Sequence, residues 1–577
     1  MAEDNEVFIE DEVIVLEDSE ESDVDDLNAS KIIPFIMGRY NKADDARQQD
    51  EMRWLRSYRN YRGLYGSDVQ FTEAEKSRVF IKITKTKTLA AYGQIIDVLF
   101  ANNKFPLTVD PTELPDGVVA DVSFDPKEPE ELRESDADKS VSPYGYSGDG
   151  RDIPAGATDK TLSESLGEYT DKLKDIDNLK IGAGKTPTSI TFSPAMIAAK
   201  KMQKKIQDQL EESSASKHLR STAFEMALFG TGVMKGPFAV DKEYPSWGDD
   251  GEYNPSIKTV PFTSHVSIWN FYVDPDADNM DEAQYVIERH KMSRSQLRGL
   301  KKRPFFRNSV VDEVIDMGES YYKKYWEDDL NDYQVDKGVD RFEVLEFWGV
   351  VDTKLLEGNE VDIPETLKDV DQLQANIWVC NNKIIRLVLN PFKPAKIPYY
   401  AVPYELNPYS LFGIGIAENM DDTQTLMNGF MRMAVDNAVL SGNLIFEVDE
   451  TNMVPGQDLS VYPGKVFRRQ GGAPGQGIFG TKFPNVSNEN MQLFDKARVL
   501  ADESTGFPSF AHGQTGVSGV GRTASGISML MNAASGSIKT VIKNVDDYLL
   551  RPIGEAFFSF NMQFDYDEEI KGDLEVK

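Results

Sequence analysis

Residues 411–443 constrain the fold more than any other stretch, because they predict a single helix longer than an ordinary core element. The stretch reads LFGIGIAENMDDTQTLMNGFMRMAVDNAVLSGN. After Gly415, apolar residues recur at helical spacing, and polar residues follow a second face at four-residue steps. A helix over 416–440 spans roughly 37 Å at 1.5 Å per residue. The pattern predicts a rod built for packing, with an end signal at Gly442.

Two sets of side chains define the expected rod. One set should pack in an apolar seam, and it comprises Met420, Met427, Met431, Ala434 and Ala438. The other should form a polar ladder on a different face, and it comprises Gln424, Asn428 and Arg432. The methionines make the rod an adaptable packing surface, because their side chains are flexible and polarizable.

The rest of the chain predicts an α+β fold with two disordered acidic segments. Residues 1–30 contain 13 Asp or Glu and no Lys or Arg, and residues 107–192 are dominated by Pro, Asp, Glu, Ser and Gly. Neither segment has enough apolar surface to offset its ordering entropy. We expect helices at about 43–66, 72–102, 194–229, 293–328, 488–504 and from Thr523, and strands within 233–275, 341–351, 376–389, 399–405, 443–448 and 465–470.

The composition limits the classes of partner. The formal net charge is −33, and such an acidic protein should not grip nucleic acid over its whole surface, because phosphate contacts require Lys and Arg. The single cysteine, Cys380, fits a reducing compartment. The N-terminus has no basic region typical of a signal peptide, and no apolar run is long enough to span a membrane.

The motifs of nucleotide, metal and hydrolase sites are incomplete. KIGAGKTPTS (180–189) has Leu179 where a phosphate-binding loop needs glycine, and GIGIAE (413–418) and GVGRTA (519–524) only half-match a dinucleotide fingerprint. DPDADNMDEAQY (274–285) lacks the glycine and the glutamate of a calcium loop. The four histidines have no paired zinc spacing. We therefore expect no catalytic residue, cofactor or metal.

The helix RWLRSYRNYRGLYG allows two interpretations. Its Arg53, Arg56, Arg59 and Arg62 alternate with aromatic residues, as in proteins that bind single-stranded nucleic acid. Alternatively, the aromatic residues face inward and the arginines pair with acidic neighbours. In so acidic a chain we favour the second interpretation.

The chain resembles the portal, or head-to-tail connector, proteins of short-tailed double-stranded DNA phages. The resemblance rests on a series of stretches between about residues 52 and 560: RNYRGLYG, FEMALFGTGVMKGP, SIWNFYVDPDADNMDEAQYVIERH, IPYYAVPYELNPYSLFGIGIAENMDDTQTLMNGFMRMAVDNA and GRTASGISMLMNAASGSIKTVIKNV. No single motif among them is diagnostic, but their order along the chain is specific.

This resemblance implies a structural role in a ring of twelve subunits at one capsid vertex, assembled in the host cytoplasm. The implied partners are further copies of the chain, double-stranded DNA in the channel, the terminase, the major capsid and scaffolding proteins, and head–tail adaptor or tail proteins, with no membrane. The expected divisions are an acidic disordered arm (1–42), wing-like helices (43–106), a flexible insertion (107–192), a wing-like helix with strands (193–275), a helical patch with a β-rich clip (276–410), the stem helix (411–443), a region of strands, a helix and the channel-loop candidate (444–522), and a channel-side helix (523–577).

The Gly-rich stretch 506–521 is the first candidate for the loop that faces DNA. It has five glycines and no charged side chain, so it lacks the Lys and Arg side chains that usually bind phosphate. Its candidate contact residues, with the flanking arginine, are Phe510, His512, Gln514, Ser518 and Arg522. The alternative is GGAPGQGIFG (471–480), and the sequence does not choose between them.

Two other functions stay open at this point: another virion structural protein, such as an adaptor or capsid component, and a nucleotide-dependent packaging enzyme. The second should carry an intact phosphate-binding loop, which GAGKT after Leu179 is not. Portal proteins usually continue into a crown, so we also expect a truncated or partly ordered C-terminus after IKGDLEVK.

Overall fold

The computed structural model describes most of the chain outside the acidic arm, the insertion and the Gly-rich loop. The described residues are 22–66, 69–73, 75–100, 105–109, 194–247, 252–330, 341–357, 361, 363–443, 445–460, 462–471, 478–507 and 538–564, with the backbone alone for 22–30 and 194–197. Contacts divide the chain into unit 1 (1–101 and 209–564) and unit 2 (102–208 and 565–577). Helix α5 (Pro194–Glu212) supplies most of the described part of unit 2.

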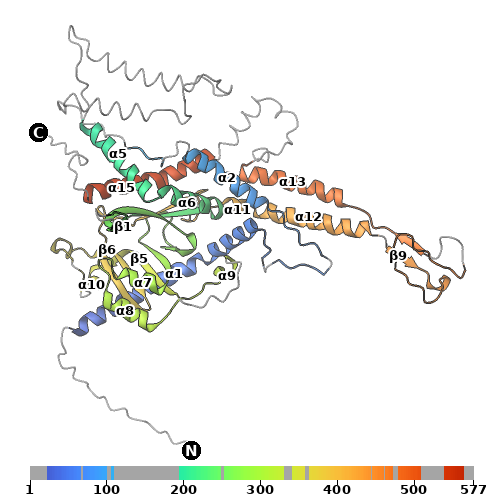
Figure 1. Ribbon diagram of the computed structural model, residues 1–577, viewed down its shortest axis with the longest axis horizontal. Helices are drawn as coiled ribbons and strands as arrows, with labels where there is room; N and C mark the ends of the chain where they lie inside the picture. The colour runs from blue at the N-terminus through green and yellow to red at the C-terminus, as the bar shows by residue number, and fades with distance from the viewer. Residues whose placement is uncertain are drawn as a thin grey trace, which may run out of the picture. The chain divides into compact units, whose positions relative to one another are not determined.

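Unit 1 is built on two antiparallel sheets (Figure 1). The larger sheet has the order β3-β4-β5-β6-β7, with β3 at Phe271–Val273, β4 at Tyr285–Met292, β5 at Phe342–Asp352, β6 at Gln372–Cys380 and β7 at Lys383–Leu389. The smaller sheet has the order β2-β1-β8, with β1 at Thr231–Tyr244, β2 at Ser256–Val266 and β8 at Tyr399–Pro403. One core cluster contains residues from both sheets, among them Val233 of β1 and Val286 of β4. The mixed α+β class is confirmed.

The larger sheet is covered on both faces, as its near-continuous apolar strands require. Side chains alternate along a strand, so Leu345 and Phe347 of β5 share a core with Ile32 and Ile36 of helix α1. Val344, which precedes Leu345 on β5 and faces the other side, belongs to a different core with helices α7 and α8. The other described helices that precede β8 are α1 (Ser22–Arg62), α2 (Ile83–Leu99), α6 (Ala215–Phe229), η1 (Ile268–Asn270), α7 (Arg294–Leu300), α8 (Asn308–Met317), α9 (Trp326–Leu330), α10 (Thr353–Leu356) and η2 (Glu365–Leu367).

Helix α1 corrects the expected boundary of the disordered arm. Residues 22–42 were expected to be disordered, but they form the first half of α1. Ile32 and Ile36 are fully buried, so this half of α1 is stabilised by tertiary packing, which the acidic block 1–30 does not indicate. Residues 1–21 lie outside the described part of the chain.

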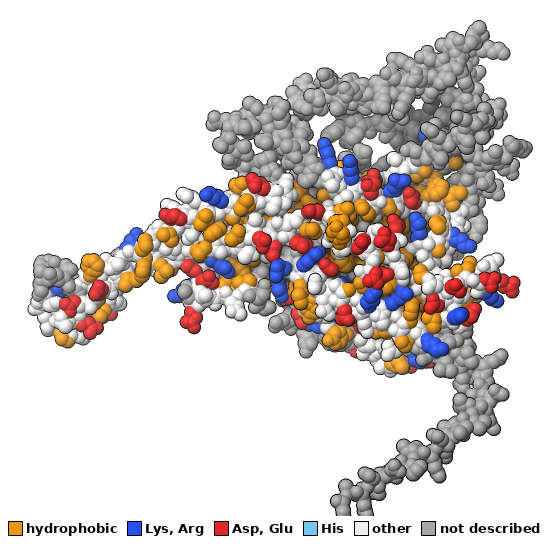
Figure 2. Space-filling view, turned by 180° about the vertical axis from the view of Figure 1, so that it is seen from behind, with side chains coloured by type: hydrophobic (Ala, Val, Ile, Leu, Met, Phe, Trp, Pro, Cys, Tyr) orange, Lys and Arg blue, Asp and Glu red, His pale blue; other side chains and the backbone are white. Residues whose placement is uncertain are grey.

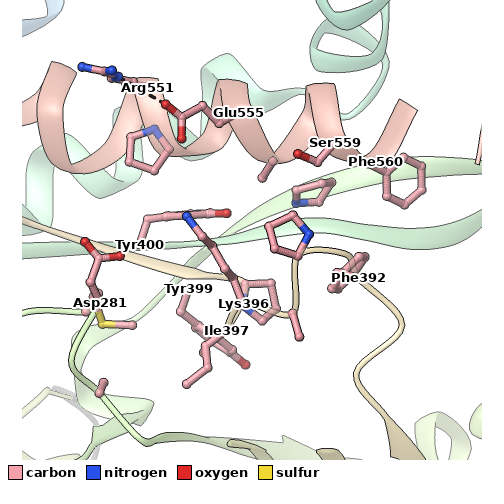
Figure 3. Close-up of a pocket in the computed structure, with 18 of the residues that line it drawn as sticks. Asp281, Phe392, Lys396, Ile397, Tyr399, Tyr400, Arg551, Glu555, Ser559 and Phe560 are labelled. Atoms are coloured by element: carbon pink, nitrogen blue, oxygen red, sulfur yellow. Dashed lines mark hydrogen bonds and ion pairs between the residues drawn. The ribbon is translucent and has the colours of Figure 1, made fainter. Parts of the chain in front are cut away.

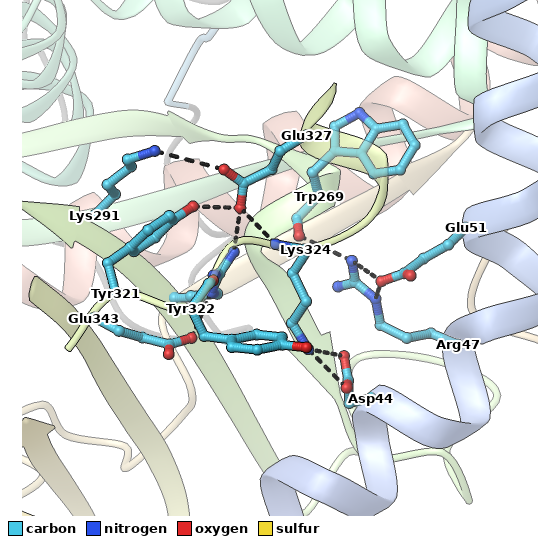
Figure 4. A network of polar contacts seen from close by, with 11 residues as sticks. Asp44, Arg47, Glu51, Trp269, Lys291, Tyr321, Tyr322, Lys324, Glu327 and Glu343 are labelled. Carbon is cyan, nitrogen blue, oxygen red and sulfur yellow. Dashed lines mark hydrogen bonds and ion pairs between the residues drawn. The ribbon is translucent and has the colours of Figure 1, made fainter. Parts of the chain in front are cut away.

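A polar network fastens α1 to the sheet region (Figure 4). The buried Arg47 guanidinium donates to the Trp269 carbonyl at 2.8 Å and pairs with Glu51 at 2.8 Å. Lys324 Nζ pairs with Asp44 at 2.7 Å. Nearby, burial opposes ionisation of Glu327, but the Tyr321 hydroxyl, the Lys324 amide and Arg289 together lower the pKa of its carboxyl.

Four further expectations about local structure are corrected. The helix expected over 72–102 is only α2, because residues 75–82 have no regular secondary structure. The helix expected over 194–229 is interrupted at Ser214, which has a left-handed φ of 54°. The strand expected over 376–389 is the β6–β7 hairpin, turned at Asn381 and Asn382 with φ of 49° and 56°, values that asparagine tolerates in a tight turn. Residues 465–470 form no strand, only an isolated bridge from Arg469 to Met453.

The second half of unit 1 contains a helical pair and a C-terminal helix. The long helix expected over 416–440 is two helices, α11 (Ile416–Asn419) and α12 (Asp421–Gly442), separated at Met420. Next come β9 (Ile445–Val448), η3 (Glu450–Asn452), β10 (Ile478–Thr481) and α13 (Ser487–Thr505). Residues 538–564 are helical, with a π-helical turn, η6 (Asp546–Leu550), before α15 (Arg551–Phe564).

Candidate functional site

Helices α12 and α13 pair to form a rod that ends in the β9–β10 hairpin (Figure 1). Met427 and Ala434 of α12 are buried, as are Phe494, Ala497 and Ala501 of α13. Small residues on both helices allow close approach of the two backbones, since a helix pair packs ridges into grooves. The rod therefore has its own apolar seam within one subunit.

The apolar residues predicted for the seam are not equally buried. Met420, Met427 and Ala434 are buried, whereas Met431 is half-buried and Ala438 is exposed. Exposure increases toward the hairpin end of α12, where residues 438–440 are all exposed. The end of the predicted seam at Ala438 is thus open to solvent in the single subunit.

The predicted polar ladder has a role that the sequence pattern did not reveal. Gln424 and Asn428 are 0% and 4% exposed, and they bind the irregular segment that precedes α2 and the first turn of α2. Gln424 Oε1 accepts from the Thr84 amide at 3.1 Å, and its Nε2 donates to the Ile81 carbonyl at 2.6 Å. Asn428 Oδ1 accepts from the Ile81 amide at 3.0 Å.

Two further residues of α12 continue this contact. Asp436 accepts from the Ser77 amide at 2.9 Å. The Arg432 guanidinium lies 5.2 Å from the Tyr65 ring centre and 5.1 Å from that of Phe71, within cation–π range. The polar face of α12 therefore holds a non-helical strip of backbone whose hydrogen bonds no sheet satisfies.

We expect Gln424→Ala to loosen this strip. The substitution orphans the buried Thr84 amide, at a cost of about 1–3 kcal/mol. It also removes one donor from the half-buried Ile81 carbonyl, which keeps the Ile83 amide as a partner at 2.9 Å. Amide hydrogen exchange across residues 77–84 should accelerate, while Thr425→Ala, at an exposed position of the same helix, should leave it unchanged. Equal protection in both variants would contradict the role assigned to Gln424.

The glycines of GIGIAE serve close packing. Gly415 is the N-cap of α11, which confirms the interpretation of these glycines as helix-start residues. A Cβ on Gly413 would lie 2.7 Å from the Gly230 carbonyl oxygen, and a Cβ on Gly415 would lie 2.7 Å from the Gly230 amide nitrogen. Gly230 itself has φ +92° and ends α6, a left-handed helix end that favours glycine.

The arginines of α1 pair with acidic residues, as favoured. Arg53 lies 3.5 Å from Glu418, Arg56 lies 3.2 Å from Asp421, and Arg59 lies 2.6 Å from Asp329. Trp54, between them, is buried. These pairs join α1 to the α11–α12 junction and to α9.

The outer surface of the rod is rich in exposed apolar side chains (Figure 2). On α12, Leu440 is 56% exposed, and on α13, Val499 is 55% exposed. The others on the two helices are Leu426, Met433, Val439, Met491, Leu493 and Leu500, and those of the hairpin region are Ile445, Phe446, Leu459, Tyr462, Val466, Phe479, Phe483 and Val486. Apolar surface gathered on one element of a soluble protein marks an interaction surface.

A cluster of ionisable residues lies between the two sheets. Glu288 and His290 of β4 and Glu346 of β5 bring ligand atoms within 4.8 Å of one another, a possible metal-binding set. Lys235 Nζ of β1 lies 2.6 Å from Glu346 and 3.1 Å from Glu288. Its ammonium group neutralises the carboxylates that a metal ion would need, so the cluster is explained as a buried ion network.

The charges in this cluster stabilise one another. Burial opposes ionisation of Lys235 and Glu346, yet the facing charges raise the pKa of the Lys235 ammonium and lower the pKa of the Glu346 carboxyl. Burial also disfavours protonated His290, but Glu288 and Glu346 raise the pKa of its imidazole. Glu346 further accepts from Trp348 Nε1 at 2.7 Å, which makes it the centre of the network.

A cavity of about 790 Å³ lies between the loop before β8 and helix α15 (Figure 3). Phe392, Lys396 and Tyr400 line one side, and Arg551 and Glu555, which pair at 3.2 Å, line the other. Among the described residues, none that the sequence singled out as a site residue lines this cavity.

The channel-loop candidates Phe510, His512, Gln514, Ser518 and Arg522 lie outside the described residues, as do the motifs at 180–189 and 519–524. In the alternative loop 471–480, residues 472–477 are also outside, and the rest leads into β10. No helix in the described part of the chain is both long and apolar enough to cross a membrane.

One comparison with known families bears on the whole C-terminal half of the chain. The family model described as phage SU10 portal protein matches residues 254–572. The match begins before β2 and extends through the larger sheet, the rod, the hairpin and α15. It covers more than half of the sequence and confirms the resemblance to phage portal proteins. The chain belongs to the phage SU10 portal protein family.

Proposed function

We propose that the protein forms a homo-oligomeric ring at one capsid vertex, through which double-stranded DNA is packaged and ejected. The observation that carries this proposal is the apolar surface of the rod. Leu440 and Val499 are more than half exposed although both are large and apolar. A second copy of the rod buries them, since burial of one such side chain contributes about 1.5–3 kcal/mol. Family membership makes the role structural and the protein a component of the phage particle.

Within this ring, the α12–α13 pair is the stem and residues 443–486 are the clip. The β-rich region 276–410 was the expected clip, but its strands β4 to β7 belong to the larger sheet and share cores with α1, α7 and α8. The β9–β10 hairpin instead lies between the two rod helices in the sequence and at the end of the rod (Figure 1). It is the better candidate for contacts with terminase and tail proteins, and the two sheets with their helices form the wing, which faces the capsid and scaffolding proteins.

The acidic composition of the chain suits a channel through which DNA must slide. A channel wall that neutralised many phosphates would hold the DNA, because each neutralised phosphate adds about 0.9 to the salt slope of binding. With a net charge of −33 per subunit, the ring repels DNA from its surface in general. The uncharged segment 506–521 is the proposed channel loop, with 471–480 as the alternative.

Electron cryo-microscopy of the purified full-length protein tests this function. We expect closed rings, of twelve subunits by family resemblance, with stem helices side by side around a central channel and the segment around Gln514 lining it. A population made of monomers or open filaments at micromolar concentration would contradict the proposal. Closed rings with residues 471–480 at the narrowest point would change only the assignment of the channel loop, from 506–521 to 471–480.

A further inference from the structure

Residues 294–307 form a strongly basic segment in this acidic chain. The sequence RSQLRGLKKRPFFR contains six Lys or Arg and no Asp or Glu, against a net charge of −33 for the whole protein. The segment covers α7 and the turn before α8. Its apolar residues Leu297, Leu300 and Phe306 are buried in the core formed with α8 and strands β5 to β7, which leaves the basic side chains on the outside.

Half of these cations have no ionic partner among the described residues. Arg294 pairs with Glu319 at 3.7 Å, and Lys301 pairs with Asp312 at 2.5 Å. Arg298, Lys302 and Arg303 are exposed, and within the described part of the chain none of them forms an ion pair. Burial lowers the pKa of the neighbouring Arg386, and the like charge of Arg303 lowers it further. The local field therefore favours an anionic ligand.

An exposed aromatic ring accompanies these cations. Phe305 is 71% exposed and has a left-handed φ of 67°. A bulky residue rarely adopts this backbone conformation, and residues held in it are concentrated at binding sites. The fold thus exposes a phenyl ring two positions after Arg303 in the sequence, so the ligand should combine negative charge with apolar groups.

The N-terminal arm of the same chain has this chemistry. Residues 1–21, MAEDNEVFIEDEVIVLEDSEE, contain ten Asp or Glu and no Lys or Arg. Two apolar runs, VFI at 7–9 and VIVL at 13–16, alternate with the acids. We propose that residues 3–18 of this arm dock on the basic segment 294–307, with carboxylates on Arg298, Lys302 and Arg303 and an apolar run on Phe305.

The geometry of unit 1 brings the arm within reach. Ile32 and Ile36 of α1 pack on one face of the larger sheet, and α7 with α8 packs on the other. Packed layers lie about 10 Å apart. A segment of 21 residues can extend roughly 70 Å at 3.3–3.6 Å per residue. Covalent attachment also gives the arm a high effective concentration at this surface.

Double-stranded DNA is the competing ligand, because exposed cations also bind phosphates. The affinity for DNA grows with each phosphate that the protein neutralises. Three unpaired cations neutralise few phosphates, so they should bind DNA weakly. The arm is favoured because it is tethered and because its apolar runs can pack against Phe305, whereas the surface of duplex DNA has no such run.

Photo-cross-linking in the full-length protein tests the docking. With p-benzoylphenylalanine in place of Phe8, we expect cross-links that mass spectrometry maps to residues 298–306. Replacement of Arg298, Lys302 and Arg303 by Glu should lower this yield by about tenfold or more, because like charges then face each other. The matched control replaces Lys217, Arg220 and Lys258, three other exposed cations, by Glu and should keep the yield.

A charge exchange separates lost docking from lost folding. In the variant with the reversed segment, Glu10→Lys, Asp11→Lys and Glu12→Lys should restore the cross-link to 298–306. Cross-links that map elsewhere, or a yield insensitive to the reversal, would overturn the proposal. The proposal would also be overturned if the wild type bound labelled duplex DNA, the charge-reversed variant did not, and no cross-links to the arm formed. The basic segment would then be a DNA site.

Discussion

Val439→Asp combined with Val499→Asp should leave the subunit folded and abolish its assembly. Both side chains are 55% exposed in the single subunit, so each carboxylate is solvated in the monomer. In the proposed ring the substitutions remove roughly 3–6 kcal/mol of apolar burial from each interface, and they place charges where a neighbouring rod packs. Mass photometry should show monomers at concentrations where the wild type forms rings, with unchanged circular dichroism.

The matched control for this variant is Thr425→Asp with Gln492→Asp. It adds the same charge to exposed polar positions of the same two helices, where no apolar burial is lost. We expect rings from this control. If the Val439 and Val499 variant assembled like the wild type, the rod surface would not be part of the subunit interface. The stem assignment would then lose its main support.

Lys235→Met should destabilise unit 1 by about 3–5 kcal/mol, the usual cost of leaving a buried charge without its partner. The Lys235 side chain is 8% exposed and that of Glu346 is 3% exposed, so water cannot replace the lost ammonium group. Chemical denaturation of the assembly-deficient double variant measures the effect without a contribution from ring formation. Lys217→Met, at an exposed position, should change stability by less than about 0.5 kcal/mol.

The loss caused by Lys235→Met should shrink as the pH falls. The facing carboxylates raise the folded-state pKa of His290, so stability from protonated His290 is fully present below its unfolded pKa of about 6.5. That stability is lost as the pH rises through the raised folded pKa. Protonated His290 can therefore replace part of the missing charge near pH 6 but not near pH 9. A deficit independent of pH between these values would show that His290 does not compensate.

The sequence alone determined the class, the family and most local elements. Helix α13, the end of α6 at Gly230 and the helix start at Gly415 were all predicted, because caps and apolar periodicity are encoded within a few residues. The pairing of Arg53 and Arg56 with acids also followed from composition, since an acidic chain offers each arginine many partners. Because the phosphate, calcium and zinc motifs are incomplete, the sequence favoured a role in packing over a nucleotide or metal site.

Tertiary structure decided which face of each helix is buried and against what. Gln424 and Asn428 were visible as a polar ladder, but their partners are backbone groups of residues 81 and 84, more than 300 positions away. The half of α1 before residue 43 was assigned to the disordered arm because it follows and overlaps the acidic block 1–30, whereas Ile32 and Ile36 pack against apolar residues of β5 and β6. Lys235 likewise meets Glu288 and Glu346 only where two sheets pack together. Periodicity is a local property and burial is not, so the sequence predicted the rod but not what its polar face holds.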